Sequence, residues 1–182
     1  MKTIQLSSNV MVSDPCYSVP TWCQTQLDNV LAGKYYIDVQ TDEDDGRNYA
    51  IVAVHEDYVS QKKRWYNHGE FGVDSGQAGI FDMASYRNDE VAESITTPEY
   101  DFSIPRHEDG DEWYIKMCKL TLATENSWGS YDQGVVSSSG WGDGSYPLKV
   151  QKDKGKIVGI CLDFGMTDVQ AKFLMSLIGE NA

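Results

Sequence analysis

The sequence predicts a mainly β (α+β) fold, an antiparallel sandwich or partly open barrel with a packed C-terminal helix. Short runs of β-branched and aromatic residues recur along the chain, turn-forming residues separate them, and two connections have the composition of hairpin turns. A chain of 182 residues buries roughly 70% of its unfolded surface on folding. We therefore expect one compact domain, residues 1–182, whose core needs neither disulfides nor metal.

The first expected strand is residues 9–13, an apolar run that Asp14-Pro15 ends. Residues 34–40 and 47–55 flank a polar connection ending in Asp-Gly, which indicates a hairpin. A second hairpin is expected around Asp153-Lys154-Gly155, and one longer segment alternates apolar with polar residues as a half-buried strand does. The remaining expected strands are residues 70–74, 78–82, 113–122 (the alternating segment), 148–151 and 156–164.

A helix is expected over residues 19–31. Ser18 can cap its first turn, Pro20 lies where a missing N–H does no harm, and Gly33 follows its end. Four apolar residues would share one face of this helix, namely Cys23, Leu27, Val30 and Leu31.

The expected C-terminal helix carries stronger signals. Thr167 and Gln170 have the spacing of a capping box, and Gly179 marks the end. Its apolar stripe consists of Val169, Phe173, Leu174 and Leu177. We expect this stripe to pack against the sheet.

Residues 87–112 form the most loop-like segment, an acidic loop or insertion. They include nine acidic residues, two prolines and few aliphatic residues. A loop of this length inside a compact domain is uncommon and is usually functional or mobile. The alternative is a solvated insertion without a role of its own.

The charge excludes some classes of partner. With 28 Asp and Glu against 15 Lys and Arg, the net charge is −13, which argues against general binding to nucleic acid or to anionic membranes. A protein partner with a basic surface remains open, and so does imitation of nucleic acid, although acidity can also serve solubility alone. A nucleic-acid mimic would need carboxylates arrayed on one face, and the candidates are Asp42, Asp44, Asp45, Asp109 and Asp111.

The chain shows neither an export signal nor a membrane segment. No stretch approaches the roughly 20 apolar residues of a membrane helix, and the N-terminus lacks the apolar region of a signal peptide. A cytoplasmic protein with reduced thiols is therefore expected. No cofactor and no zinc or iron–sulfur site is predicted, because no pair of the four cysteines forms a Cys-x-x-Cys motif; these are Cys16, Cys23, Cys118 and Cys161.

Three clusters of small and polar residues are the candidates for a site. They are Ser-Asp-Pro-Cys-Tyr at 13–17, Val-Asp-Ser-Gly-Gln-Ala-Gly-Ile-Phe-Asp at 73–82, and Ser-Ser-Ser-Gly-Trp-Gly-Asp-Gly-Ser-Tyr-Pro at 137–147. Glycines at this density allow a backbone to approach a ligand closely, or to form tight turns in which an Asp bonds its own backbone. The candidate ligand-binding residues are Tyr17, Ser75, Gln77, Ser139, Trp141 and Tyr146.

Carboxylates that converge on one pocket can bind a cation or act as general acid and base. The sequence does not show such convergence, so no metal site is predicted. Cys16 is a candidate nucleophile, but a catalytic thiol needs a base, and no spacing ties His55 or His68 to it. The catalytic candidates are Asp14, Cys16, Asp74, Asp82 and Asp143.

No known catalytic motif is present. Asp74-Ser75-Gly76 does not form a Gly-x-Ser-x-Gly elbow, and the chain has no phosphate-binding Gly-x-x-x-x-Gly-Lys-Ser/Thr loop. The leading hypothesis is therefore an acidic binding or interaction protein. The alternative is a hydrolase-like enzyme with an Asp-rich pocket, and in a third reading the clusters only build turns. The sequence does not predict an oligomeric state.

The three clusters together resemble uncharacterised proteins of bacteria and their phages. The second and third also resemble the bacterial family described as domain of unknown function 4241, which shows Asp-x-Gly…Asp and, near the C-terminus, Ser-Gly-x-Gly-Asp-Gly-x-Tyr-Pro. The resemblance spans about residues 12–164. It implies a common fold and pocket, a phage or bacterial origin, and an intracellular location. A phage-encoded binding protein that acts on a host or bacterial component is the form of the leading hypothesis that fits this origin. The resemblance implies no activity.

Overall fold

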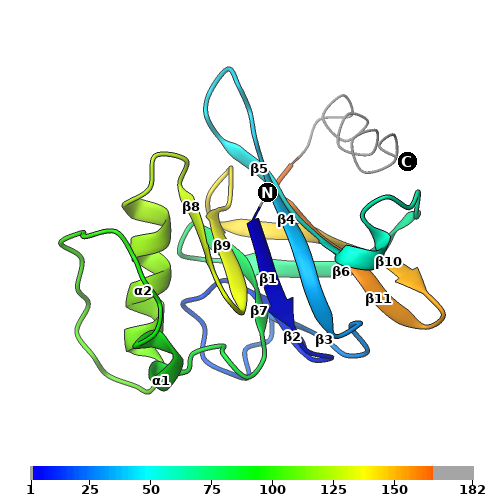
Figure 1. Cartoon of the computed structure of the whole chain (residues 1–182). Helices are drawn as coiled ribbons and strands as arrows, with labels where there is room; N and C mark the ends of the chain where they lie inside the picture. The colour runs from blue at the N-terminus through cyan, green and yellow to red at the C-terminus, as the bar shows by residue number, and fades with distance from the viewer. Residues whose placement is uncertain (1, 166–182) are drawn as a thin grey trace.

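The computed structural model describes residues 2–165 (Figure 1). Two antiparallel sheets pack face to face as a sandwich that does not close into a barrel, and a helix lies beside one of them. The predicted mainly β, antiparallel sandwich is confirmed. The expected C-terminal helix lies outside the described residues.

The larger sheet contains the first and last described strands. Its order is β1 (Lys2–Leu6), β4 (Gly33–Thr41), β5 (Asn48–His55), β11 (Lys156–Asp163), β10 (Gly144–Asp153) and β6 (Trp65–Val73). Both predicted hairpins, β4–β5 and β10–β11, are present. In the second hairpin Lys154 and Gly155 both have positive φ, as a tight two-residue hairpin turn requires.

The smaller sheet has the order β3 (Thr25–Leu27), β2 (Val10–Ser13), β7 (Gln77–Asp82), β9 (Gly134–Ser138) and β8 (Trp128–Tyr131). The sequence analysis missed β1, β3, β8 and β9. The last two contain Gly129 and Gly134, and glycine is depleted in strands, so their composition resembles a loop.

The main core fills the space between the two sheets. Large side chains from both inner faces meet there, including Tyr35, Phe71 and Phe164, each at most 1% exposed. β5 is buried along its whole length because a second apolar cluster, with Tyr58 and Val59 beside it, covers the outer face of the strand. This double burial explains why residues 49–54 read as one unbroken apolar run.

The helix predicted over residues 19–31 is wrong. This segment turns through residues 20–24, adds β3 to the edge of β2, and forms a bridge from Val30 to Ile157. Cys23, Leu27 and Val30 are buried as the helical spacing required, but Cys23 lies in the turn, Leu27 in β3 and Val30 in the bridge. Backbone pairing with β2 outweighs a helix preference that the β-branched Thr21 and Thr25 already weaken.

The strand predicted over residues 113–122 is also wrong, because this segment is helix α2 (Asp111–Leu122). The buried residues Trp113, Ile115 and Met117 alternate as they would in a strand. The buried side of the segment also includes Cys118, Leu120 and Thr121, and only a helix brings all of these residues together. Acidic residues in the first turn and a lysine in the last were the sequence signal for this helix.

Residues 87–112 contain a second, short helix, α1 (Asp89–Ala92), and otherwise lack regular structure up to α2. The carboxylate of Asp89 accepts hydrogen bonds from the backbone N–H of Gly110 and Trp113, at 2.9 and 3.0 Å. Asp111 accepts from Arg87, whose guanidinium is almost fully buried. These contacts anchor both ends of the acidic segment and cap the N-terminus of α2.

Candidate functional site

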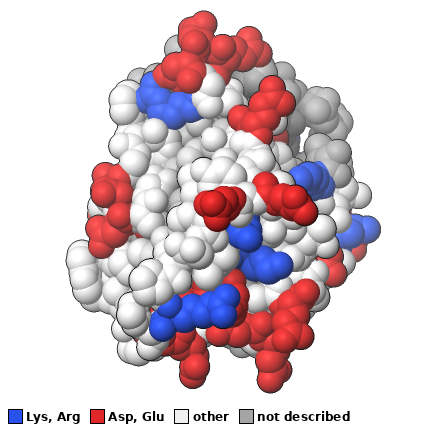
Figure 2. All heavy atoms as spheres, turned by 90° about the vertical axis from the view of Figure 1, so that its left-hand side faces the viewer, with Lys and Arg blue, Asp and Glu red and all other residues white. Residues whose placement is uncertain are grey.

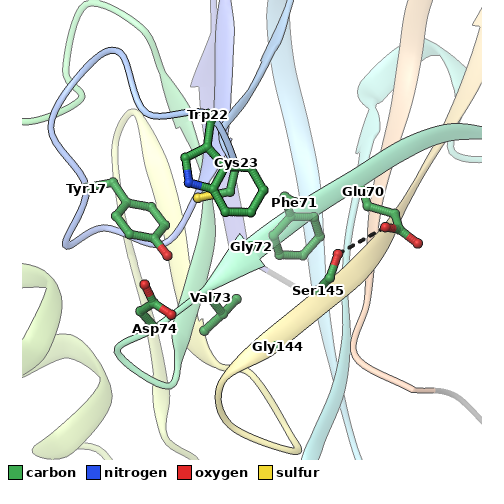
Figure 3. A pocket seen from close by; sticks show the side chains of 10 residues that line it. All are labelled: Tyr17, Trp22, Cys23, Glu70, Phe71, Gly72, Val73, Asp74, Gly144 and Ser145. Atoms are coloured by element: carbon green, nitrogen blue, oxygen red, sulfur yellow. Dashed lines mark hydrogen bonds between the residues drawn. The ribbon is translucent and has the colours of Figure 1, made fainter.

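A cleft of about 530 Å³ lies where the edge strand β6 meets the β2–β3 connection (Figure 3). All three sequence clusters reach it: the first through Tyr17, the second through Val73 and Asp74, and the third through Gly144 and Ser145. The other lining residues are Trp22, Cys23, Glu70, Phe71 and Gly72. The sequence analysis named Tyr17 and Asp74 and missed the rest.

The β2–β3 connection forms one wall of the cleft and is attached to β6. The backbone N–H of Gly72 donates to Cys23 O at 2.9 Å, and the Thr25 hydroxyl donates to Glu70 O at 3.1 Å. A Cβ at position 72 would lie 2.8 Å from the Cβ of Cys23, so this close approach requires glycine. Tyr86 holds the other end of the connection, because its hydroxyl donates to Tyr17 O at 2.7 Å.

Aromatic rings dominate the cleft. Trp22 is 94% exposed and presents its ring to solvent, whereas Phe71 belongs to the main core and forms the floor. Tyr17 faces them from the far side of the connection (Figure 3). Trp and Tyr each combine a large apolar face with a polar group, so together they form an amphipathic surface suited to binding.

Two carboxylates lie at opposite ends of this surface. Glu70 accepts a hydrogen bond from the Ser145 hydroxyl at 3.1 Å, and Asp74 points toward the Tyr17 hydroxyl (Figure 3). Partial burial, and then the neighbouring Asp74, raise the pKa of Tyr17, so this phenol stays protonated and can donate a hydrogen bond. The cleft therefore combines aromatic faces with negative charge.

Asp14 lies behind the cleft and holds it together. Its buried carboxylate accepts four hydrogen bonds: from the N–H groups of Cys16, Asp74 and Ser75, at 2.8, 2.8 and 2.6 Å, and from the Ser75 hydroxyl at 2.7 Å. This one side chain joins the end of β2 to the β6–β7 turn. A carboxylate occupied by four donors is a poor general base, so the contact of Ser75 with Asp14 fixes the turn and does not activate a nucleophile.

Cys16 lies beside Asp14 and is half-buried. Burial, followed by the charge of Asp14, raises the pKa of the Cys16 thiol above that of an ordinary cysteine. A catalytic thiol needs the opposite shift, and the reactive species is the thiolate. The surroundings of Cys16 therefore suppress its reactivity.

Alkylation of Cys16 by iodoacetamide is expected to be much slower than that of an unstructured cysteine at pH 8, because the raised pKa leaves little thiolate. The rate should continue to rise beyond pH 9, and unfolding in urea should restore the ordinary rate. Mass spectrometry of the modified peptide measures this, and Cys16→Ser identifies the signal. A rate that reaches its plateau below pH 8 would show an activated thiol.

Asp82 and Asp143 do not line the cleft. Asp82 ends β7, a strand length of roughly 16 Å from the cleft side of that strand, and accepts from Ser7 N and Ala84 N. Asp143 is exposed in the β9–β10 connection. Of the acidic candidates, the structure thus brings together Asp14 and Asp74, but only Asp74 lines the cleft.

The remaining binding candidates lie outside the cleft and contact other parts of the protein. The buried hydroxyls of Ser139 and Tyr146 both donate to Gly142 O, at 2.8 and 2.7 Å. Gln77 joins α2 to the sheet by accepting from the Thr121 hydroxyl at 2.8 Å. Trp141 is 68% exposed, but the Arg47 guanidinium lies 3.6 Å from the centre of its ring.

The carboxylates considered for nucleic-acid mimicry are spread over different parts of the surface. Asp42, Asp44 and Asp45 lie in the β4–β5 connection, whereas Asp111 is buried at the start of α2. Figure 2 shows the face that carries α1 and α2, where acidic groups lie at the top, the centre, one edge and the bottom, separated by uncharged and basic surface. This arrangement differs from the single acidic face that mimicry requires.

Within residues 2–165 there is no group of three His, Cys, Asp or Glu side chains that could hold a metal ion. In the same range no helix is long and apolar enough to cross a membrane. Comparison of the chain with protein-family models, with curated proteins and with solved structures finds no match.

Proposed function

We propose that this protein is an acidic binding protein that captures a cationic side chain of a partner protein in the cleft. The observation that carries the proposal is the pairing of the exposed Trp22 and the half-buried Tyr17 with the carboxylates of Glu70 and Asp74 around one cavity. In keeping with the resemblance of the sequence clusters, we further propose a cytoplasmic, phage-encoded protein whose partner is a bacterial host component.

The chemistry of the cleft favours an arginine or a lysine. An arginine guanidinium stacked on a Trp or Tyr face gains about 0.5–2 kcal/mol, and more as water is excluded. The carboxylates add attraction at short range, and the net charge of −13 increases the rate at which a basic segment arrives. Because the cleft is open to solvent, we expect an extended segment with one anchoring side chain rather than an enclosed small molecule.

The hydrolase-like alternative receives less support. The raised pKa of the Cys16 thiol disfavours its reactive thiolate, and the Ser75 hydroxyl donates to the Asp14 carboxylate, which already accepts three other hydrogen bonds. Within residues 2–165, neither the Cys16 thiol nor the Ser75 hydroxyl has a hydrogen bond to a histidine. Three of the four acidic candidates do not line the cleft: Asp14, Asp82 and Asp143. Recognition requires none of these groups to react.

An arginine flanked by alanines in a short peptide is expected to bind the cleft with modest affinity. Amide chemical shifts of Gly72 and Asp74 and the indole N–H of Trp22 should move in NMR titrations. Trp22→Ala should weaken binding about tenfold, because the stacking energy is lost. Asp74→Asn should weaken it as well, more at low than at high salt.

Asp143→Asn is the matched control, because it removes one exposed carboxylate outside the cleft. Binding should then change little. The proposal fails if a glutamate peptide of the same length binds as tightly, or if the shifted signals lie away from β6 and the β2–β3 connection.

A further inference from the structure

Basic residues gather at one end of the six-stranded sheet. Residues 62–68 and 151–157 contain six of the chain's 15 Lys and Arg residues but only one of its 28 Asp and Glu residues. In Figure 1 these segments lie together on the right, where the β5–β6 connection meets the β10–β11 turn. We call this surface the basic end, and its charged residues are Lys62, Lys63, Arg64, Lys152, Lys154 and Lys156.

Hydrogen bonds hold the two segments together. The β6–β10 pairing places Trp65 opposite Gln151, and the amide of Gln151 donates to Lys63 O at 3.0 Å. The Tyr58 hydroxyl and the Lys63 ammonium both donate to the carboxylate of Asp153. Residues about 90 positions apart thus form one fixed surface.

Most of the positive charge at the basic end is uncompensated. Its one carboxylate, Asp153, is paired with Lys63, which lowers the pKa of that carboxyl. Glu56 in the same connection is paired with Lys34. Within residues 2–165 the remaining five cations of the basic end form no ion pair, and all are exposed: Lys62, Arg64, Lys152, Lys154 and Lys156.

The basic end also carries an exposed aromatic ring. Tyr66 is 47% exposed, and the Arg64 guanidinium lies 5.4 Å from the centre of its ring. His68 follows two residues later on the same edge strand, and partial burial, followed by the charge of nearby Lys152, lowers the pKa of its imidazole. Residues 66–70 are all exposed, so the Tyr66 ring lies on an accessible strip of β6 that begins next to Arg64.

The net charge of the whole chain does not prevent an anion from binding here. At physiological salt, charges more than about 8 Å apart are largely screened, so the local surface decides. An acidic polypeptide would use the cations alone, whereas a single-stranded nucleic acid would use the cations for its phosphates and the ring for a base.

We propose that the basic end binds single-stranded nucleic acid, with phosphates on the exposed cations and a base stacked on Tyr66. This site lies outside the cleft and does not depend on the function proposed for it.

The test uses the full-length chain and a fluorescein-labelled oligothymidylate of about 16 nucleotides, a length within the range bound by single-strand binding folds. Fluorescence anisotropy should show binding that weakens with salt, with a slope of about −0.7 in log K per phosphate contacted. The triple variant Lys62→Glu, Arg64→Glu, Lys154→Glu should lose more than about tenfold in affinity and show a smaller slope.

A matched triple variant carries the same change of charge elsewhere on the surface: Lys2→Glu, Arg106→Glu and Lys119→Glu. It should bind nearly as well as the parent, and circular dichroism should show that both triple variants are folded. An equal loss of affinity in both triple variants would show that only the overall charge matters and would overturn the assignment. The absence of any binding at low salt would also overturn it.

Substitutions of Tyr66 distinguish binding of nucleic acid from binding of other polyanions. Tyr66→Ala should weaken oligothymidylate binding about tenfold, and Tyr66→Phe should restore it, because stacking needs only the ring. Polyglutamate of the same charge should compete poorly. If polyglutamate competes as well as the oligonucleotide, or if Tyr66→Ala has no effect, the surface binds acidic chains in general and the proposal is wrong.

Discussion

Replacing Asp14 with alanine is expected to destabilise the protein by about 3–5 kcal/mol and to abolish binding at the cleft. The carboxylate accepts four hydrogen bonds from two segments 60 residues apart, and its removal leaves these donors unpaired in a mostly buried place. A total stability of about 5–15 kcal/mol is usual, so the loss is a large part of it. Urea denaturation should show a lower midpoint with an unchanged slope.

Two variants make this result specific. Asp14→Asn keeps the shape and one acceptor oxygen but loses the charge, so an intermediate loss is expected. Asp143→Ala, at an exposed carboxylate, should change stability by less than about 0.5 kcal/mol. An Asp14→Ala protein that keeps its full stability but loses an enzymatic activity would contradict the anchoring role and support a catalytic one.

Replacing Trp113 with alanine is expected to cost about 3–5 kcal/mol and to detach α2 from the five-stranded sheet. Trp113 is fully buried, and its ring lies 5.0 Å from that of Phe81 and 5.1 Å from that of Tyr86. The Tyr86 hydroxyl in turn holds the β2–β3 connection, so the loss should extend to the cleft. Thermal unfolding and hydrogen exchange of the α2 amides measure both effects.

Leu122→Ala is the matched control on the same helix, because Leu122 is 50% exposed. It should alter stability by less than about 0.5 kcal/mol. If Trp113→Ala leaves the exchange protection of α2 and the Trp22 signals unchanged, the two parts of the structure are not coupled through Tyr86.

Sequence predicted best those elements whose evidence lies within a few residues. The β10–β11 hairpin follows from Lys154-Gly155, since the tight turn needs positive φ at both positions. β5 follows from its long apolar run, which only a doubly covered strand requires. The three clusters also indicated the region of the site, because each of them contributes residues to the cleft.

Where two local patterns fit the same residues, sequence chose wrongly. Residues 113–122 satisfy strand alternation and helical spacing together, and the sheet surface beneath them selected the helix. Residues 19–31 have helical spacing, but the edge of β2 has unpaired backbone N–H and C=O groups. Residues 25–27 hydrogen-bond to these groups and form β3. In both cases the decisive partner lies far away along the chain.

The sequence by itself thus determined the β class, the two hairpins, and the acidity that restricts the partners. Tertiary structure alone decided which polar residues form a site. In the folded chain Asp14 lies behind the cleft and anchors it, Asp82 and Asp143 lie away from the cleft, and Trp22 lies beside β6. The physical reason is that strand pairing and side-chain hydrogen bonds join residues 60 or more positions apart, and no local pattern records such contacts.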